Sequence, residues 1–346
     1  MKIAVLFGGS SFEHEISIVS AITMKKVLSK SSLIFIFVDR DRDFYLIEGS
    51  AMKSKLFSSG EYKRGKKLIL KRGGFFAEGM FGSREISLDV LLNLIHGRDG
   101  EDGKVASLME FYGTAFISPR MEASALSYNK LYTKLLAESL GVRVVPYQHL
   151  SKNDDRVVTL SYPMIVKPVR LGSSIGVTIA REPQELDYAL DVAFEFDSDV
   201  VIEPFLDGVK EYNQAGCKTE IWELSIVEEP QKEKFLDFEK KYMDFARDSQ
   251  VLAADISDSL RDDIGECFKK IYDPLFLGSI IRCDFFVVDG EVMLNEINPI
   301  PGSMANYLFE DFEGMVERLA KNLPREKRIE IDYQYIHSIQ SAKGKA

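Results

Sequence analysis

The chain has 346 residues, with 54 acidic and 44 basic side chains and a formal net charge of −10. This length predicts about two or three domains with a sizeable core. The acidic balance argues against a nucleic-acid or membrane-surface binder, because either would need a basic face. No apolar run approaches the ~20 residues that span a bilayer, and the apolar stretch 1–7 is too short for a signal peptide.

The first third of the chain has the pattern of an α/β unit. The apolar run 2–7 predicts a buried strand, Gly8 and Gly9 form a turn, and residues 17–28 have helical periodicity. Further strands are expected at 33–38, 44–47, 67–70 and 88–95. We therefore expect an N-terminal α/β domain with a mostly parallel sheet over residues 1–95.

The rest of the chain predicts two further α/β units and a tail. The clearest amphipathic stretch is 124–140, which Gly141 is well placed to end. The other expected helices are 103–112, 183–196, 260–276 and 312–323, and the expected strands are 142–145, 164–166, 176–180, 200–204, 211–217 and 221–227, with a hairpin at 280–288 and 292–297. The expected boundaries are a central subdomain at 96–180, a C-terminal subdomain at 181–325 and a polar tail at 326–346.

The hairpin carries the first chemical constellation. Arg282 and Asp284 are two residues apart on one strand, and Glu296 and Asn298 are two apart on the other. Each pair therefore points to one face, and the four side chains converge if the two faces coincide. Two carboxylates and an amide oxygen suit Mg²⁺, and a guanidinium suits a phosphate or a developing oxyanion. The alternative is the ordinary charged face of a solvent-exposed hairpin.

Lysines and glycine-rich turns supply further candidates. Lys167 ends an apolar strand, where an anionic partner such as phosphate would explain it, and the turn 172–176 offers backbone N–H groups to the same anion. Lys130 lies on the amphipathic helix and reads equally well as a solvated surface lysine. The loop 96–103 follows a buried strand, and its residues fit either a ligand-binding loop or a turn that caps the next helix. The polar stretch 231–258 fits a mobile lid or a surface loop.

Taken together, these motifs resemble the D-alanine–D-alanine ligases of the ATP-grasp superfamily, over essentially the whole chain from Gly8 to about Leu323. The motifs that carry the resemblance occur in the family's order: 8–17 (GGSSFEHEIS), 96–103 (HGRDGEDG), 124–130 (SALSYNK), 165–168 with 172–176, 239–242 (EKKY), 282–284 (RCD) and 295–302 (NEINPIPG).

The resemblance implies an ATP-grasp fold of three α/β subdomains and a ligase that makes D-alanyl-D-alanine for peptidoglycan. In that family ATP phosphorylates the carboxylate of one D-alanine, and the amine of a second attacks the acyl phosphate. Such a reaction needs cations to neutralise the transferred phosphoryl group. The implied cofactor is Mg²⁺ or Mn²⁺, two per site. The implied setting is the cytoplasm, with D-alanine and ATP as small-molecule partners, no nucleic acid or membrane, and a homodimer as the common assembly.

The resemblance also implies a role for individual residues. The implied catalytic residues are Glu13, Ser173, Tyr242, Arg282 and Gly302. The implied ATP-binding residues are Lys130, Lys167, Glu203, Leu206, Glu211 and Lys241. The implied metal ligands are Asp284, Glu296 and Asn298. The implied substrate contacts are His96, Ser303, Tyr307 and Leu308.

The chain departs from the family pattern near the second-substrate site. Tyr307 and Leu308 stand where many members have Ser and Leu to receive the second carboxylate, so Ser303 or backbone groups would serve instead. Two alternatives therefore stay open. One is a ligase with a different second substrate, such as D-serine, and the other is a catalytically silent ATP-binding homologue.

Overall fold

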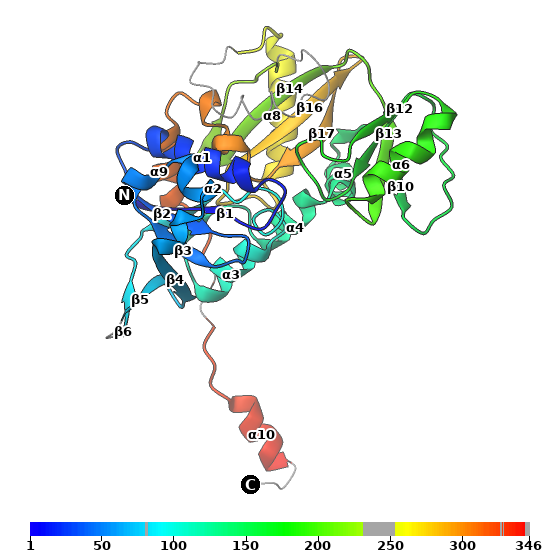
Figure 1. Cartoon of the computed structure of the whole chain (residues 1–346). Coiled ribbons are helices and arrows are strands. Elements are labelled where there is room, and N and C mark those ends of the chain that lie inside the picture. Colours follow the sequence, from blue (N-terminus) through cyan, green and yellow to red (C-terminus); the bar gives the residue numbers. More distant parts are fainter. Residues whose placement is uncertain (80–81, 231–252, 326, 328, 343–346) are drawn as a thin grey trace.

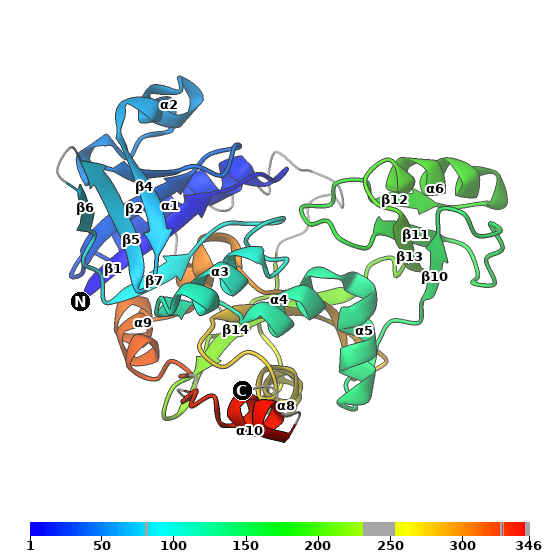
Figure 2. The same cartoon turned by 90° about the horizontal axis from the view of Figure 1, so that it is seen from below.

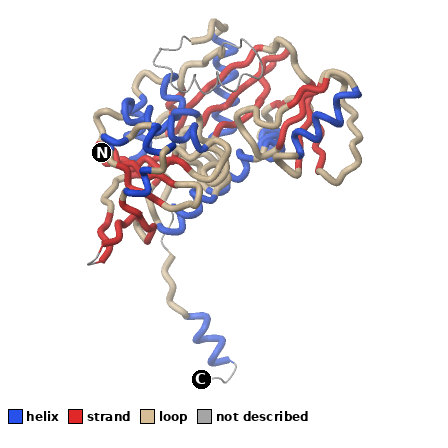
Figure 3. Tube along the Cα trace, in the orientation of Figure 1, coloured by secondary structure: helices blue, strands red, loops and turns tan. Residues whose placement is uncertain are grey.

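The computed structural model describes residues 1–79, 82–230, 253–325, 327 and 329–342. Three β-sheets of eight, four and five strands, each with helices packed beside it, form the body of the protein (Figures 1 and 2). The tube in Figure 3 shows that the four-stranded sheet lies to one side of the other two, and that the C-terminal helix extends away from the body.

The eight-stranded sheet is built around a parallel centre. Strand β1 is apolar and buried along almost its whole length, as expected for a strand covered on both faces, and it pairs in parallel with β2 and β7. The strands in spatial order are β6 (Gly82–Glu85), β5 (Gly74–Gly79), β4 (Lys66–Lys71), β3 (Phe44–Ile47), β2 (Ser32–Val38), β1 (Lys2–Gly8), β7 (Val90–Asn93) and β8 (Phe116–Ile117).

The structure corrects two expectations about this region. Strands β3 to β6 pair antiparallel, so only about half of the sheet is parallel. Strand β8 pairs with β7, so the sheet also continues beyond the boundary expected at residue 95. The helices of this part are α1 (His14–Val27), α2 (Ser54–Ser58) and α3 (Lys104–Tyr112), with 3-10 turns η1 (Gly49–Ala51) and η2 (Glu61–Arg64).

The predicted continuous helix over 124–140 is wrong, because the chain breaks at Asn129. Asn129 has extended backbone angles, and its side chain accepts a hydrogen bond from the backbone N–H of Tyr132, which caps a new helix. The region is therefore α4 (Met121–Tyr128) followed by α5 (Lys130–Ser139). The break places Lys130 in the first turn of α5, where its backbone N–H donates to the carbonyl of Val169.

The four-stranded sheet is antiparallel and has α6 packed against it. Its strands in spatial order are β10 (Gln148–Ser151), β13 (Asp199–Pro204), β11 (Met164–Pro168) and β12 (Thr178–Ala180), and its helices are η3 (Pro183–Glu185) and α6 (Leu186–Phe194). β13 lies beyond the boundary expected at residue 180, yet it pairs with β10 and β11 in this sheet.

The five-stranded sheet contains the predicted hairpin, which is confirmed. Its strands in spatial order are β15 (Trp222–Leu224), β14 (Lys210–Lys218), β16 (Ile281–Val288), β17 (Glu291–Asn298) and β9 (Arg143–Val144). The remaining helices are α8 (Asp258–Tyr272), η4 (Gly302–Leu308), α9 (Phe312–Lys321) and α10 (Gln334–Ala342). α8 packs on β14 and β17, and α1 packs on η4, which joins this sheet to the first.

Residues 334–342, in the segment expected only as a polar tail, form α10, whose described side chains are exposed. Among the described residues, none of the helices combines the length and apolar character that a membrane crossing needs.

Candidate active site

A cavity of about 240 Å³ lies where the three sheets meet. Its lining includes Glu13 from the turn before α1, Lys130 at the start of α5, Ser173 from the loop after β11 and the inward face of the hairpin β16–β17. The predicted site residues that line it are Glu13, His96, Lys130, Ser173, Glu211, Arg282, Asp284, Glu296, Asn298, Gly302 and Tyr307. Motifs from distant parts of the chain therefore converge on one space.

The hairpin register brings its four polar side chains together. Arg282 lies opposite Asn298, and Asp284 lies opposite Glu296. All four line the cavity, so the expectation that the two faces coincide is confirmed, and the reading as a solvent-exposed charged face is wrong.

Asp284 is the most tightly held member of this group. Arg282 donates two hydrogen bonds to its carboxylate, of 2.7 and 2.8 Å, and the amide of Asn298 donates a third of 2.9 Å. Burial raises the pKa of Asp284 to about 6, while the charge of Arg282 opposes that shift. Asp284 lies opposite a second carboxylate, that of Glu296. A positive charge on the cavity side would therefore favour the ionised form of both side chains.

Glu13 forms a second polar centre on the opposite wall. It is buried, and the hydroxyl of Ser173 donates a hydrogen bond of 2.6 Å to its Oε1. Burial raises the pKa of Glu13, and the charge of Glu101 adds to the effect. Ser173 has a φ of 54°, in the left-handed region that a residue with a side chain rarely adopts. This backbone conformation accompanies the direction of its hydroxyl toward Glu13.

His96 and Glu101 come from the same loop and line the cavity; His96 is buried, and the side chain of Glu101 is 15% exposed. Desolvation lowers the pKa of His96 to about 4 and raises that of Glu101 to about 8, so it favours the neutral form of each side chain. His96 Nε2 lies 3.0 Å from the hydroxyl of Ser20, which accepts a hydrogen bond from the backbone N–H of Ser303. The hydroxyl of Ser20 therefore ties α1 both to the loop of His96 and to the turn after the hairpin.

The lysines have anionic or carbonyl partners in this structure. Lys130 Nζ donates to the carbonyl of Leu171 at 2.6 Å, and Lys167 Nζ lies 2.8 Å from Glu203 Oε2. A further lysine, Lys134, lies 2.9 Å from Glu203 Oε1 and is almost fully buried. Sequence reasoning missed Lys134 and the cavity residue Glu101, because a charged side chain in an amphipathic helix or a polar loop looks like a surface residue in the sequence.

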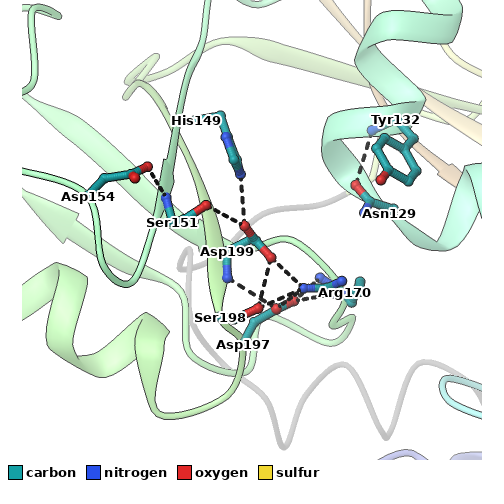
Figure 4. Close-up of polar contacts among 9 residues, drawn as sticks. All are labelled: Asn129, Tyr132, His149, Ser151, Asp154, Arg170, Asp197, Ser198 and Asp199. Carbon is teal, nitrogen blue, oxygen red and sulfur yellow. Dashed lines mark hydrogen bonds and ion pairs between the residues drawn. The ribbon is translucent and has the colours of Figure 1, made fainter.

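The loop that carries Ser173 is fixed near its start, at Arg170, by the network drawn in Figure 4. The backbone N–H of Arg170 donates to Asp197 at 2.8 Å, and its guanidinium pairs with Asp199 at 2.7 Å. Asp199 also accepts a hydrogen bond of 2.9 Å from Ser151. Burial alone would raise the pKa of Asp199, but the surrounding donors lower it to about 2. The network therefore ties the loop to β13 and β10.

Several expected site residues do not line this cavity. Leu308 is buried in a small apolar cluster with Ala215 and Ala305, and Ser303 is buried beside Ser20. Lys167, Glu203 and Leu206 lie outside its lining as well. Tyr307 does reach the cavity, where its hydroxyl bonds with Arg282. Lys241 and Tyr242 lie outside the described residues.

A cavity whose lining combines Glu13, Lys130 and a hairpin with two carboxylates is the arrangement expected of an ATP-grasp carboxylate–amine ligase. Two family models support this class: "D-ala D-ala ligase N-terminus" matches residues 2–119, and "D-ala D-ala ligase C-terminus" matches residues 136–312. The chain belongs to the D-alanine–D-alanine ligase family.

Individual relatives agree with this assignment. A protein of Sulfurovum sp. (strain NBC37-1), named D-alanine–D-alanine ligase, is 75% identical over 346 residues, which is 100% of both chains. The crystal structure of the D-alanine–D-alanine ligase from Helicobacter pylori is 50% identical with a TM-score of 0.84, covering 94% of this chain and 100% of that one. The VanG D-Ala:D-Ser ligase from Enterococcus faecalis is 27% identical with a TM-score of 0.75, covering 92% and 98%.

Proposed function

We propose that this protein joins two molecules of D-alanine into D-alanyl-D-alanine and converts ATP to ADP and phosphate, as a step in peptidoglycan synthesis. The observation that carries the proposal is the full-length 75% identity to a D-alanine–D-alanine ligase, together with a cavity lined by that family's motif residues. Of the two alternatives, D-serine as second substrate is not favoured, because the relative named for that activity is only 27% identical.

The proposed reaction has two steps, a phosphoryl transfer and an attack by an amine. A carboxylate oxygen of the first D-alanine attacks the γ-phosphorus of ATP, and the bond to ADP breaks. The amine of the second D-alanine then attacks the acyl carbon, loses a proton, and phosphate leaves. Phosphorylation is needed because a carboxylate is a poor electrophile, and the tetrahedral intermediate needs donors for its oxyanion.

The proposed roles of the side chains are substrate binding, oxyanion stabilisation and nucleotide binding. Glu13, oriented by Ser173, holds the ammonium group of the first D-alanine. Arg282 and the backbone N–H of Gly302 stabilise the oxyanion. Lys130 and Lys167 bind phosphates, while Glu203, Leu206 and Glu211 surround the adenine and ribose. The remaining proposed contacts are His96, Ser303, Tyr307 and Leu308 for the amino acids, with Lys241 and Tyr242 from the undescribed segment.

The donor set of the hairpin fits Mg²⁺ or Mn²⁺. Asp284, Glu296 and Asn298 offer hard oxygen atoms on one face, which these ions prefer. No group of three or more His, Cys, Asp or Glu side chains suited to a metal occurs in the part of the chain that the structure describes. Such ions generally complete their coordination with water or phosphate oxygen atoms. Once bound, they would neutralise the charge of the transferred phosphoryl group.

We further propose that the protein works in the cytoplasm, as a homodimer, without nucleic acid or membrane partners. The expected subdomain boundaries at residues 95 and 180 move later in the chain, because β8 and β13 belong to the sheets of the preceding units. The setting follows from the substrates, because ATP and free D-alanine are cytoplasmic metabolites. Sedimentation of the purified protein tests the dimer.

The function is tested by phosphate release from purified protein with ATP and Mg²⁺. The compared substrates are D-alanine, L-alanine, D-serine with D-alanine, and D-lactate with D-alanine, with each product identified by mass. We expect release with D-alanine alone and the dipeptide as product. Release only when D-serine is added would contradict the proposal. ATP binding without release under any condition would indicate a silent homologue.

A further inference from the structure

Three buried charges meet beside the nucleotide side of the site. The carboxylate of Glu203 on β13 forms ion pairs with two lysines. Lys167 Nζ lies 2.8 Å from its Oε2, and Lys134 Nζ lies 2.9 Å from its Oε1. Glu203 is 2% exposed and Lys134 is 1% exposed. A buried carboxylate that loses its partners costs several kcal/mol, so this pairing decides whether Glu203 stays ionised.

The two lysines are held differently. Lys134 is enclosed: its Nζ also lies 3.4 Å from the carbonyl of Val145 and 5.3 Å from the centre of the Tyr147 ring. The side chain of Lys167 is 13% exposed, and among the described residues its Nζ reaches, beyond Glu203, the amide oxygen of Asn295 at 3.5 Å. Lys134 is therefore the fixed partner of Glu203, and Lys167 is the exchangeable one.

We infer that Lys134 is a positioning residue for nucleotide binding: it keeps Glu203 compensated, so that Lys167 can leave that carboxylate for a phosphate of ATP. The inference rests on the proposed function, since it needs ATP as the ligand. With both lysines charged, the trio has an excess of one positive charge, which attracts a phosphate. Without Lys134, Lys167 and Glu203 form a neutral pair, and removing Lys167 would leave a buried anion alone.

The inference is tested by a double-mutant cycle on ATP binding, measured by calorimetry in the absence of D-alanine, and on steady-state kinetics. Lys134→Met keeps the length of the side chain and removes its charge. We expect it to raise the Kd and KM for ATP at least tenfold while kcat at saturating ATP changes less than threefold. In the Glu203→Gln background the same substitution should change the Kd less than threefold, because the anion it compensates is gone.

Two controls separate this role from packing. Lys152→Met removes an exposed lysine from the turn after β10, in the same sheet as Glu203, and should leave the Kd unchanged. Thermal unfolding shows whether Lys134→Met is folded; if it is not, Lys134→Gln replaces it, since an amide can still bond to Glu203 and Val145.

The outcomes distinguish the inference from the proposed function. Equal losses in both backgrounds of the cycle, or a loss in kcat alone, would overturn the role of Lys134. Wild-type affinity in Lys134→Met would do the same while leaving the ligase assignment intact. A wild-type protein that binds no ATP would overturn both.

Discussion

Ser173 and Glu13 are 160 residues apart in the chain, yet the hydroxyl of Ser173 donates a hydrogen bond of 2.6 Å to Glu13 Oε1. Gly172 lies against the same carboxylate, because a Cβ at this position would be 2.9 Å from Glu13 Oε1. The loop after β11 is thus built in direct contact with the turn before α1. The carboxylate that we assign to the first substrate is oriented by a different part of the chain.

Ser173→Ala should therefore weaken binding of the first D-alanine without unfolding the protein. A hydrogen bond to a charged group contributes about 1.5–3 kcal/mol, which corresponds to a rise in KM of roughly 10- to 100-fold. Phosphate release at varied D-alanine concentration measures it. Ser174→Ala is the matched control, because Ser174 has the same left-handed backbone and does not line the cavity. Equal effects of the two substitutions would contradict the role of Ser173.

Glu296→Gln should preserve the fold and reduce turnover by at least two orders of magnitude. The substitution keeps the shape of the side chain and removes one negative charge from the proposed metal face, so the dependence of the rate on Mg²⁺ concentration should move to higher concentration. Asp289→Asn removes one charge from the exposed turn of the same hairpin and serves as the control. Wild-type turnover in Glu296→Gln would rule out the metal assignment.

Glu101 should make the protein less stable as the pH rises from about 5 to 8. Its pKa is raised from 4.5 to about 8 by burial, so between these values the folded state keeps a proton that the unfolded state releases. The free energy of unfolding then falls by at most about 1.4 kcal/mol per pH unit. His96, with a lowered pKa of about 4, acts in the opposite direction below its unfolded value of 6.5.

Glu101→Gln imitates the protonated acid and should remove this loss while leaving the effect of His96 in place. Urea midpoints at pH 5, 6, 7 and 8 compare the variant with wild type, and Glu122→Gln, at an exposed position, is the control. Parallel pH profiles for Glu101→Gln and wild type would show that Glu101 is ionised in the folded protein.

Gly8→Ala should destabilise the protein by more than about 3 kcal/mol, because two costs add. Gly8 has a φ of 100°, and a Cβ there would lie 2.2 Å from the carbonyl oxygen of Val38. Gly60 has a φ of 73° with no atom within 4 Å of its Cβ position, so Gly60→Ala measures the backbone cost alone, about 1–2 kcal/mol. Similar denaturant midpoints for the two variants would show that the turn after β1 shifts to accommodate the added Cβ.

The hairpin and the pairing of polar residues on each of its strands were predictable from alternation and the two-residue turn. The turn alone would place Asp284 opposite Asn295, and a register shift between Asp284 and Phe285 brings it opposite Glu296 instead. Nothing beyond residues 280–298 is needed to bring the four side chains together. The parallel strands β1, β2 and β7 were predictable for a similar reason, since each is a short run of buried apolar residues.

The break at Asn129 was not predicted, because helical periodicity continues across it. The signal was present in the cap, since Asn is favoured at a helix N-terminus, but apolar spacing alone does not separate an interior Asn from a capping one. Lys134 and Glu101 were missed for a different reason. A buried charge looks like a surface charge in a sequence, and only the fold brings Lys134 to Glu203.

The two family matches are separated by residues 120–135, which hold α4 and the start of α5, and the contact between Ser173 and Glu13 crosses that division. Residues 2–119 provide Glu13, while residues 136–312 provide Ser173 and the hairpin carboxylates. A chimera that joins the first segment to the second segment of a distant relative would keep all three sheets and, without this contact, would bind the first amino acid less well. The proposed recognition of that substrate therefore depends on residues from both matched segments. A change at Glu13 or Ser173 in one segment would require a compensating change in the other.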